Sequence, residues 1–199
     1  DLIRAGRPVT RGTLQTVFAY TPYDELARLG LRPQTEAEAR KAAPGLTGML
    51  VVGEVQPGSP AEGQLQPGDI LLRVNGKLVA TFDPLAEVLD SSVGQGIDVE
   101  VERGGDVVRM RLVVQDLTEI TPARYLEFGD TVVHDLSYQM ARHLNVPVRG
   151  VFVASPGYTL GSAGVPRGAV ISSVAGKPVA TLADFQQAVA GLADGARVT

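Results

Sequence analysis

The chain has 199 residues, a formal net charge of −4 and a pI near 5.2. An acidic balance argues against a nucleic-acid-binding protein, which normally presents a basic face, and no apolar run approaches the roughly 20 residues that span a bilayer. The absence of Cys excludes disulfides, thiolate catalysis and Cys-ligated zinc. With 44% hydrophobic residues, 23 Gly and 13 Pro, the composition indicates a globular protein of short strands and many turns.

The first half of the sequence alternates β-forming runs with helical patterns and turn signals. Thr21-Pro22 is typical of a helix start, and Asn75-Gly76 is a strong hairpin signal. In sequence order, the predicted elements are a strand at 13–19, a helix at 23–29, a charged helical excursion within 32–47, strands at 49–55 and 70–74, a helix from 82 to about 92, and a hairpin over 97–102 and 107–114.

An internal repeat organises the rest. Residues 68–81 (GDILLRVNGKLVAT) and 168–181 (GAVISSVAGKPVAT) are identical at seven of fourteen positions. Self-similarity at a spacing of one hundred residues implies two copies of a domain of about that length. The second copy is expected to contain strands at 127–133, 150–154 and 169–174, with helices at 136–144 and 185–192.

The repeat divides the sequence into two predicted modules. The first covers residues 8–115, with the excursion 32–47 placed where it would cover or extend a binding groove; residues 116–125 form a linker, and the second module covers 126–199. The second copy stops where its last hairpin is expected to begin, so we interpret the sequence as a piece of a longer protein. Arg outnumbers Lys fifteen to three, a codon bias that suggests a GC-rich bacterial genome.

The residues at 57–61 (PGSPA), 65–71 (LQPGDIL) and 74–76 (VNG) resemble the core signature of a PDZ domain. A strand and a short helix precede this signature, an order that resembles the circularly permuted PDZ domains of HtrA-family serine proteases. Residues 11–15, 22–25, 136–142 and 147–152 are most similar to fungal nuclear HtrA-like proteases and their bacterial relatives. The second copy has Ala169 where the signature has an aspartate.

This resemblance implies an α+β fold that is mainly β: two PDZ-like, partly open β-barrel or sandwich modules, each with two or more helices. Such modules bind an extended peptide, usually the C-terminus of a polypeptide, as an added strand, and backbone amides hold its carboxylate. Gln15 stands where the family loop usually has glycine, and the acidic Glu127 and Asp130 would repel a carboxylate. The residues implied for the two grooves are Gly12, Thr13, Leu14, Gln15, Thr16, Val17, Phe18, Pro84, Leu85 and Val88, and then Glu127, Phe128, Gly129, Asp130, Phe185, Gln186 and Val189.

The resemblance also implies a function. We expect the pair to bind polypeptide C-termini or unfolded hydrophobic segments and to regulate a trypsin-like protease domain N-terminal to Asp1 in the same parent protein. The catalytic centre itself lies outside this sequence, because no serine stands in a Gly-x-Ser-x-Gly pattern. No cofactor or metal is expected, since His134 and His143 lack the spacing of a metal pair. The alternatives are a packing or homo-oligomerisation module that binds no free peptide, and a PDZ scaffold of a non-protease. The implied location is the bacterial periplasm or envelope, or the nucleus if the protein is fungal-like.

Overall fold

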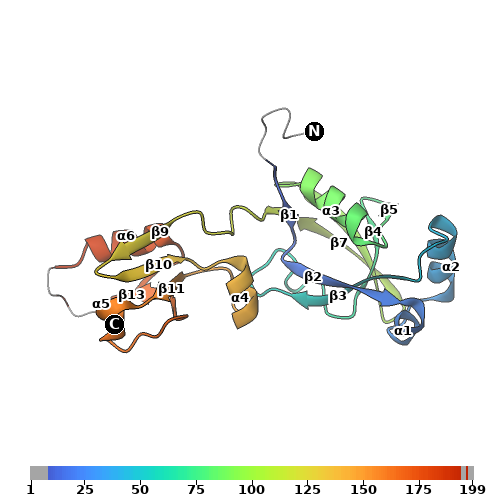
Figure 1. Ribbon diagram of the computed structural model, residues 1–199. Helices are drawn as coiled ribbons and strands as arrows, with labels where there is room; N and C mark the ends of the chain where they lie inside the picture. Colours follow the sequence, from blue (N-terminus) through green and yellow to red (C-terminus); the bar gives the residue numbers. More distant parts are fainter. Residues whose placement is uncertain (1–8, 194–195, 197–199) are drawn as a thin grey trace. The chain divides into compact units, whose positions relative to one another are not determined.

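The computed structural model describes residues 9–193 and 196, and the protein divides into two compact units, Asp1–Leu117 and Thr118–Thr199 (Figure 1). Both are of mixed α and β structure, which confirms the predicted α+β class. The described strands form open sheets rather than a closed barrel. We keep 116–125 as the proposed linker, although Asp116 belongs to the last strand of the first unit and Tyr125 to the first strand of the second.

The first unit is built on a six-stranded antiparallel sheet with the order β2-β3-β4-β6-β7, in which β5 pairs with β4. A separate two-stranded ladder joins β1 to β8. The elements of the first unit are β1 Gly12–Thr13, β2 Thr16–Pro22, α1 Tyr23–Arg28, α2 Pro33–Ala42, β3 Gly48–Val55, β4 Ile70–Val74, β5 Lys77–Leu78, α3 Phe82–Ser91, β6 Gly96–Arg103, β7 Asp106–Val113 and β8 Gln115–Asp116.

The central strands of this sheet are buried on both faces. Successive residues of β3 point to opposite faces, so Leu50 and Val52 join one apolar cluster and Met49 and Val51 join another. The first cluster contains Leu85 of α3. The second contains residues of α1 and α2, so the sheet lies between α3 on one face and α1 with α2 on the other.

The excursion 32–47 does not cover the groove beside α3, and that expectation was wrong. Ala39 of α2 is fully buried in the cluster formed by Met49 and Val51, on the face of the sheet opposite α3. The guanidinium of Arg40 lies 4.1 Å from the centre of the Tyr23 ring and joins α2 to α1. Figure 1 shows α1 and α2 lying well away from α3.

The turn before β4 is held by a buried carboxylate. Asp69 is 1% exposed, accepts a hydrogen bond from the backbone N–H of Gln66 at 2.8 Å, and binds Arg103 through both carboxylate oxygens at 2.7 and 2.8 Å. Arg103 also donates to the Gln64 carbonyl. The aspartate of the signature therefore bonds a local amide and in addition fixes the end of β6.

The second unit has a four-stranded antiparallel sheet with the order β12-β11-β10-β9 and a short β13-β14 ladder. Val133, Val153 and Phe185 lie in its core. Its elements are β9 Tyr125–Phe128, β10 Thr131–Asp135, α4 Tyr138–Leu144, β11 Val151–Ser155, α5 Gly157–Gly161, β12 Val170–Ile171, β13 Ser173–Val174, β14 Lys177–Pro178 and α6 Leu182–Ala190.

The predicted single strand at 127–133 is instead a hairpin. Gly129 and Asp130 have φ values of 47° and 62°, the left-handed conformation that a tight turn between two strands requires. Phe128 and Thr131 face each other across this turn, so β9 and β10 run antiparallel.

Candidate functional site

The outer edge of β2 carries main-chain groups that point away from the sheet. Val52 of β3 donates to the Asp69 carbonyl and accepts from the Gly68 N–H, both at 2.8 Å, so its polar groups are turned toward the loop before β4. Phe18 lies directly opposite Val52. Because directly opposed residues of an antiparallel pair turn their main-chain groups either toward each other or both away, those of Phe18 point to the free edge.

The same geometry holds two residues earlier. Gln56 donates to the Gln15 carbonyl at 3.0 Å, a bond that flanks the opposed pair Thr16 and Val55. Thr16 therefore also turns its N–H and C=O outward, and Tyr20 follows by the two-residue period of a strand. The edge of β2 presents an alternating row of donors and acceptors with which an extended segment can pair.

The loop before β2 is fastened to α3. The side chain of Asp90 accepts from the Gly12 N–H at 2.9 Å and from Arg11 at 2.8 Å. Gln15 has a φ of 53° and is only 4% exposed, and its side-chain amide donates to Gln115 of β8. This contact fixes a left-handed position that would otherwise favour glycine.

Two loop amides already have partners. The Gly12 N–H is bonded to Asp90, and the Gln15 N–H donates to the Thr13 hydroxyl oxygen at 2.9 Å. A terminal carboxylate seated against this loop would compete with the Thr13 hydroxyl for the Gln15 N–H.

Replacing Thr13 by Val is expected to release this amide and to tighten the binding of a peptide free acid about fivefold, or roughly 1 kcal/mol for one net hydrogen bond. Thr13→Ser keeps the hydroxyl and is the control. The ratio of free-acid to C-terminal-amide affinity, measured by fluorescence anisotropy, checks the prediction. An unchanged ratio in Thr13→Val would show that the loop does not receive a carboxylate.

The side of α3 that faces the loop is identified by Asp90. Residues four apart share one side of a helix, so Ala86 and Phe82 lie on the same side as Asp90, one and two turns earlier. Leu89 lies next to them and packs against the same apolar cluster as Phe18. Phe82 is 49% exposed, which is unusual for a large apolar side chain.

The structure brings together most of the residues predicted for the first groove. Leu14 and Leu85 are buried in one cluster, against which Phe18 and Val88 pack. Pro84 is exposed and is absent from this cluster. Of the helix residues predicted from the sequence, Leu85 and Val88 therefore face the core, and the side of α3 that carries Phe82 and Ala86 was not among the predictions. The four-residue spacing back from Asp90 was the available signal.

In the second unit, the residues predicted as an open loop lie elsewhere. Glu127 and Phe128 end strand β9, and Gly129 and Asp130 form the hairpin turn. Phe185 is 3% exposed and belongs to the core. Gln186 and Val189 are exposed on α6, whereas Ala188 of the same helix packs against the core.

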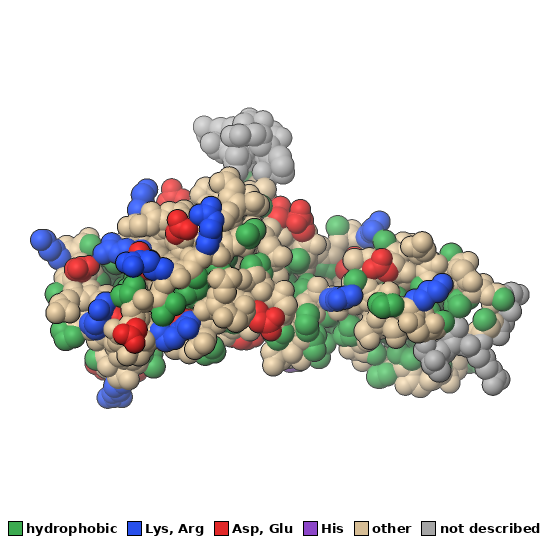
Figure 2. All heavy atoms as spheres, turned by 180° about the vertical axis from the view of Figure 1, so that it is seen from behind, with side chains coloured by type: hydrophobic (Ala, Val, Ile, Leu, Met, Phe, Trp, Pro, Cys, Tyr) green, Lys and Arg blue, Asp and Glu red, His purple; other side chains and the backbone are tan. Residues whose placement is uncertain are grey.

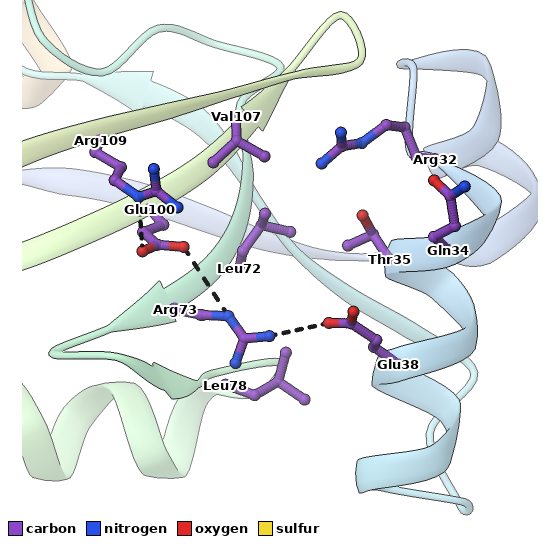
Figure 3. A pocket seen from close by; sticks show the side chains of 10 residues that line it. All are labelled: Arg32, Gln34, Thr35, Glu38, Leu72, Arg73, Leu78, Glu100, Val107 and Arg109. Atoms are coloured by element: carbon purple, nitrogen blue, oxygen red, sulfur yellow. Dashed lines mark hydrogen bonds and ion pairs between the residues drawn. The ribbon is translucent and has the colours of Figure 1, made fainter.

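A hollow of about 280 Å³ lies between α2 and the sheet, on the face opposite α3 (Figure 3). Four of its five charged side chains bind one another: Arg73 bonds Glu38 at 3.0 Å, and Arg109 bonds Glu100 at 2.9 Å. The fifth, Arg32, bonds Glu102 at 3.0 Å. Figure 2 shows the same mixture of positive and negative side chains on the surface of the first unit. Ion pairs that line the hollow therefore join α2 to the sheet.

Neither a membrane-spanning helix nor a metal cluster is found in the described part of the protein. None of the helices between residues 9 and 193 has the length and apolarity that crossing a bilayer requires. Over the same stretch, no three His, Asp or Glu side chains gather closely enough to hold a metal ion.

The sequence matches two PDZ family models, a PDZ domain at residues 51–103 and a PDZ-like domain at 119–195. It is 47% identical over 96% of its length to Protease Do-like 7 of Arabidopsis thaliana, covering 17% of that protein. It is 43% identical over 100% of its length to Pro-apoptotic serine protease nma111 of Aspergillus terreus, covering 19% of that protein. The HtrA-type protease AlgW with decapeptide matches 58% of this protein and 32% of its own length at 26% identity, with a TM-score of 0.43.

The sequence thus spans less than a fifth of the length of these curated relatives. Both relatives are eukaryotic, one from a plant and one from a fungus, so the expectation of a bacterial, periplasmic protein finds no support. The two matched models lie in the two compact units. The protein is thus a pair of PDZ domains, similar in sequence to Do-like and nma111 serine proteases.

Proposed function

We propose that the first PDZ domain binds an extended polypeptide segment as an added strand on β2, in the groove between β2 and α3. The observation that carries the proposal is the outward main chain of Thr16 and Phe18 on an edge that pairs with no other strand of the described sheet. Strand addition supplies affinity through main-chain hydrogen bonds and specificity through side-chain pockets.

The ligand is a hydrophobic segment, either a C-terminus or an unfolded internal stretch. Phe18 of β2 and Leu89 of α3 pack against one apolar cluster, and Phe82 exposes its ring further along the helix. Apolar ligand side chains at alternate positions would bury this surface, with roughly 25 cal/mol gained per Å² removed from water.

In the parent protein, we propose that this binding regulates a serine protease domain of the same polypeptide. The names of the relatives support the presence of such a domain. Coupling between two sites is typically worth about 1–3 kcal/mol, enough to change an affinity roughly 5- to 150-fold. The fungal relatives favour the nucleus as the proposed location.

The groove is tested by placing a charge on the loop-facing side of α3. Ala86→Glu is expected to weaken binding of labelled apolar peptides at least tenfold, because a carboxylate would be buried by the added strand. Ala37→Glu is the matched control, since it makes the same change at an exposed position on α2. Fluorescence anisotropy with free-acid and amide peptides measures both variants.

Equal affinities of the two variants would place the ligand elsewhere. An absence of saturable binding by the unmodified protein up to about 1 mM, where a contact is worth roughly 4 kcal/mol, would reject peptide binding. A packing or oligomerisation role for the pair would then stand in its place.

A further inference from the structure

We infer that the second PDZ domain carries its own ligand: strand β9 occupies, in cis, the edge that β2 leaves free in the first domain. Strand β10 is the equivalent of β2. Val153 of β11 accepts from the Gly168 N–H and donates to the Ala169 carbonyl, both at 2.9 Å, as Val52 does with Gly68 and Asp69. Val133 lies opposite Val153, as Phe18 lies opposite Val52.

The two strands also share an irregularity. The register shifts between Val132 and Val133 in β10 and between Val17 and Phe18 in β2. Thr131 and Val133 thus hold the places of Thr16 and Phe18. By the same rule of opposed pairs, Val133 turns its main-chain groups away from β11.

In the second domain these outward groups already have a strand beside them. Phe128 lies opposite Thr131, and Leu126 lies opposite Val133. β9 runs antiparallel to β10 and ends at the loop before it, which is the direction and position of a ligand added to a PDZ edge. The main-chain row that β2 offers to a partner is therefore paired within the second domain itself.

The side chains of β9 complete the similarity to a bound ligand. Leu126 and Phe128 both pack against the core cluster of the second unit, and the Phe128 ring lies 5.9 Å from that of Phe185 on α6. Tyr125, at the start of the strand, is 66% exposed. The occupying segment thus presents an aliphatic residue and, two positions later, an aromatic one.

The turn that joins β9 to β10 is fixed by α5. The Asp130 carboxylate accepts from the Tyr158 N–H at 2.8 Å, and the fully buried Thr131 hydroxyl donates to the Pro156 carbonyl at 2.7 Å. A Cβ on Gly157 would overlap with Asp130, so the turn and α5 fit closely. The second groove is closed in this conformation, and a ligand must displace β9 to enter it.

The pairing of β9 with the edge of β10 is independent of the proposed function. Only the statement that β2 offers the equivalent edge to a ligand rests on it. Amide hydrogen exchange of the whole protein, resolved by NMR, tests the occupied edge and the free edge separately. Thr131 and Val133 are expected to exchange at least tenfold more slowly than Thr16 and Phe18 without any ligand. An apolar peptide that binds is expected to slow exchange at Thr16 and Phe18 only.

Fast exchange at Thr131 and Val133 that slows when peptide is added would overturn the inference and leave the proposed function intact. Unchanged exchange at Thr16 and Phe18 with added peptide would reject the proposed function, while protection at Thr131 and Val133 would still support a paired β9. The unmodified protein decides both points, so neither depends on a variant that folds.

A pair of substitutions on β9 adds a second test. Phe128→Ala is expected to speed exchange at Thr131 and Val133 at least tenfold, whereas Tyr125→Ala, on the exposed end of the strand, leaves it within twofold. The synthetic peptide PARYLEF, which copies residues 122–128, is expected to restore protection in Phe128→Ala. Equal exchange in the two variants would contradict the inference.

Discussion

Gly12→Ala is expected to lower the free energy of unfolding of the first unit by about 2–3 kcal/mol, within the range for overpacked sites, and to weaken peptide binding at least tenfold. A Cβ at Gly12 would overlap with the Leu89 carbonyl and approach Val114 Cγ1 to 2.8 Å. Because the nearest atoms belong to the backbone of α3, the helix end must move. The Asp90–Gly12 hydrogen bond that fastens this loop to α3 is then lost.

Urea titration followed by hydrogen exchange at Val99 and Val101, in the core of the first unit, measures the stability of that unit alone. Gly53→Ala is the matched control, since the nearest atom to its Cβ is the Val17 carbonyl oxygen at 3.6 Å, an ordinary contact. A Gly12→Ala variant as stable as Gly53→Ala would mean that the loop and α3 are less closely packed than described.

Asp69→Ala is expected to lower the free energy of unfolding of the first unit by about 3 kcal/mol, the lower end of the range for breaking a buried ion pair. The substitution removes the acceptor of two Arg103 donors and of the Gln66 N–H. The hydrogen bond to Asp69 raises the pKa of the Arg103 guanidinium above its usual value. Arg103 therefore stays charged and loses its carboxylate partner, keeping only the bond to the Gln64 carbonyl.

Asp98→Ala is the control, because Asp98 and its partner Arg111 are both 68% exposed and such pairs contribute about 1 kcal/mol or less. The same urea titration compares the two variants. The second domain has Ala169 at the equivalent position and forms the same backbone bonds, in which Val153 accepts from the Gly168 N–H and donates to the Ala169 carbonyl. A loss below about 1 kcal/mol in Asp69→Ala would show that the turn in the first domain is equally independent of its carboxylate.

The sequence predicted the fold class, which the structure confirms, whereas the groove residues named from it remain predictions. The Pro-Gly-Asp turn and the Asn75-Gly76 hairpin are local signals, and the structure contains both. The sheet face against which α2 packs depends on which face the other helices leave exposed. The sequence pattern around Ala39 carries no information about this choice. On α3, Leu85 and Val88 were assigned to the groove from the family resemblance. Leu85 is buried in the core and Val88 packs against it, and the side that carries Phe82 and Ala86 lies next to them.

The hairpin of the second domain shows a different limit of prediction from the sequence. Residues 127–133 place β-forming residues on both sides of a Gly-Asp pair, and they predict one strand unless the turn between them is recognised. Gly129-Asp130 is such a turn signal. Whether the strand before it pairs with β10 or leaves the edge free depends on tertiary contacts such as that between Phe128 and Phe185.

The two-residue turn between β9 and β10 also sets a concentration scale. A strand tethered so closely has an effective concentration of millimolar or more at its neighbour, and a free segment must match this value or bind more tightly to compete. If a free segment binds with the same intrinsic affinity as β9, it therefore occupies half of the second domains only when its concentration is at least equal to the effective concentration of β9. A single polypeptide would then contain a sensitive receptor and a threshold receptor built on the same fold.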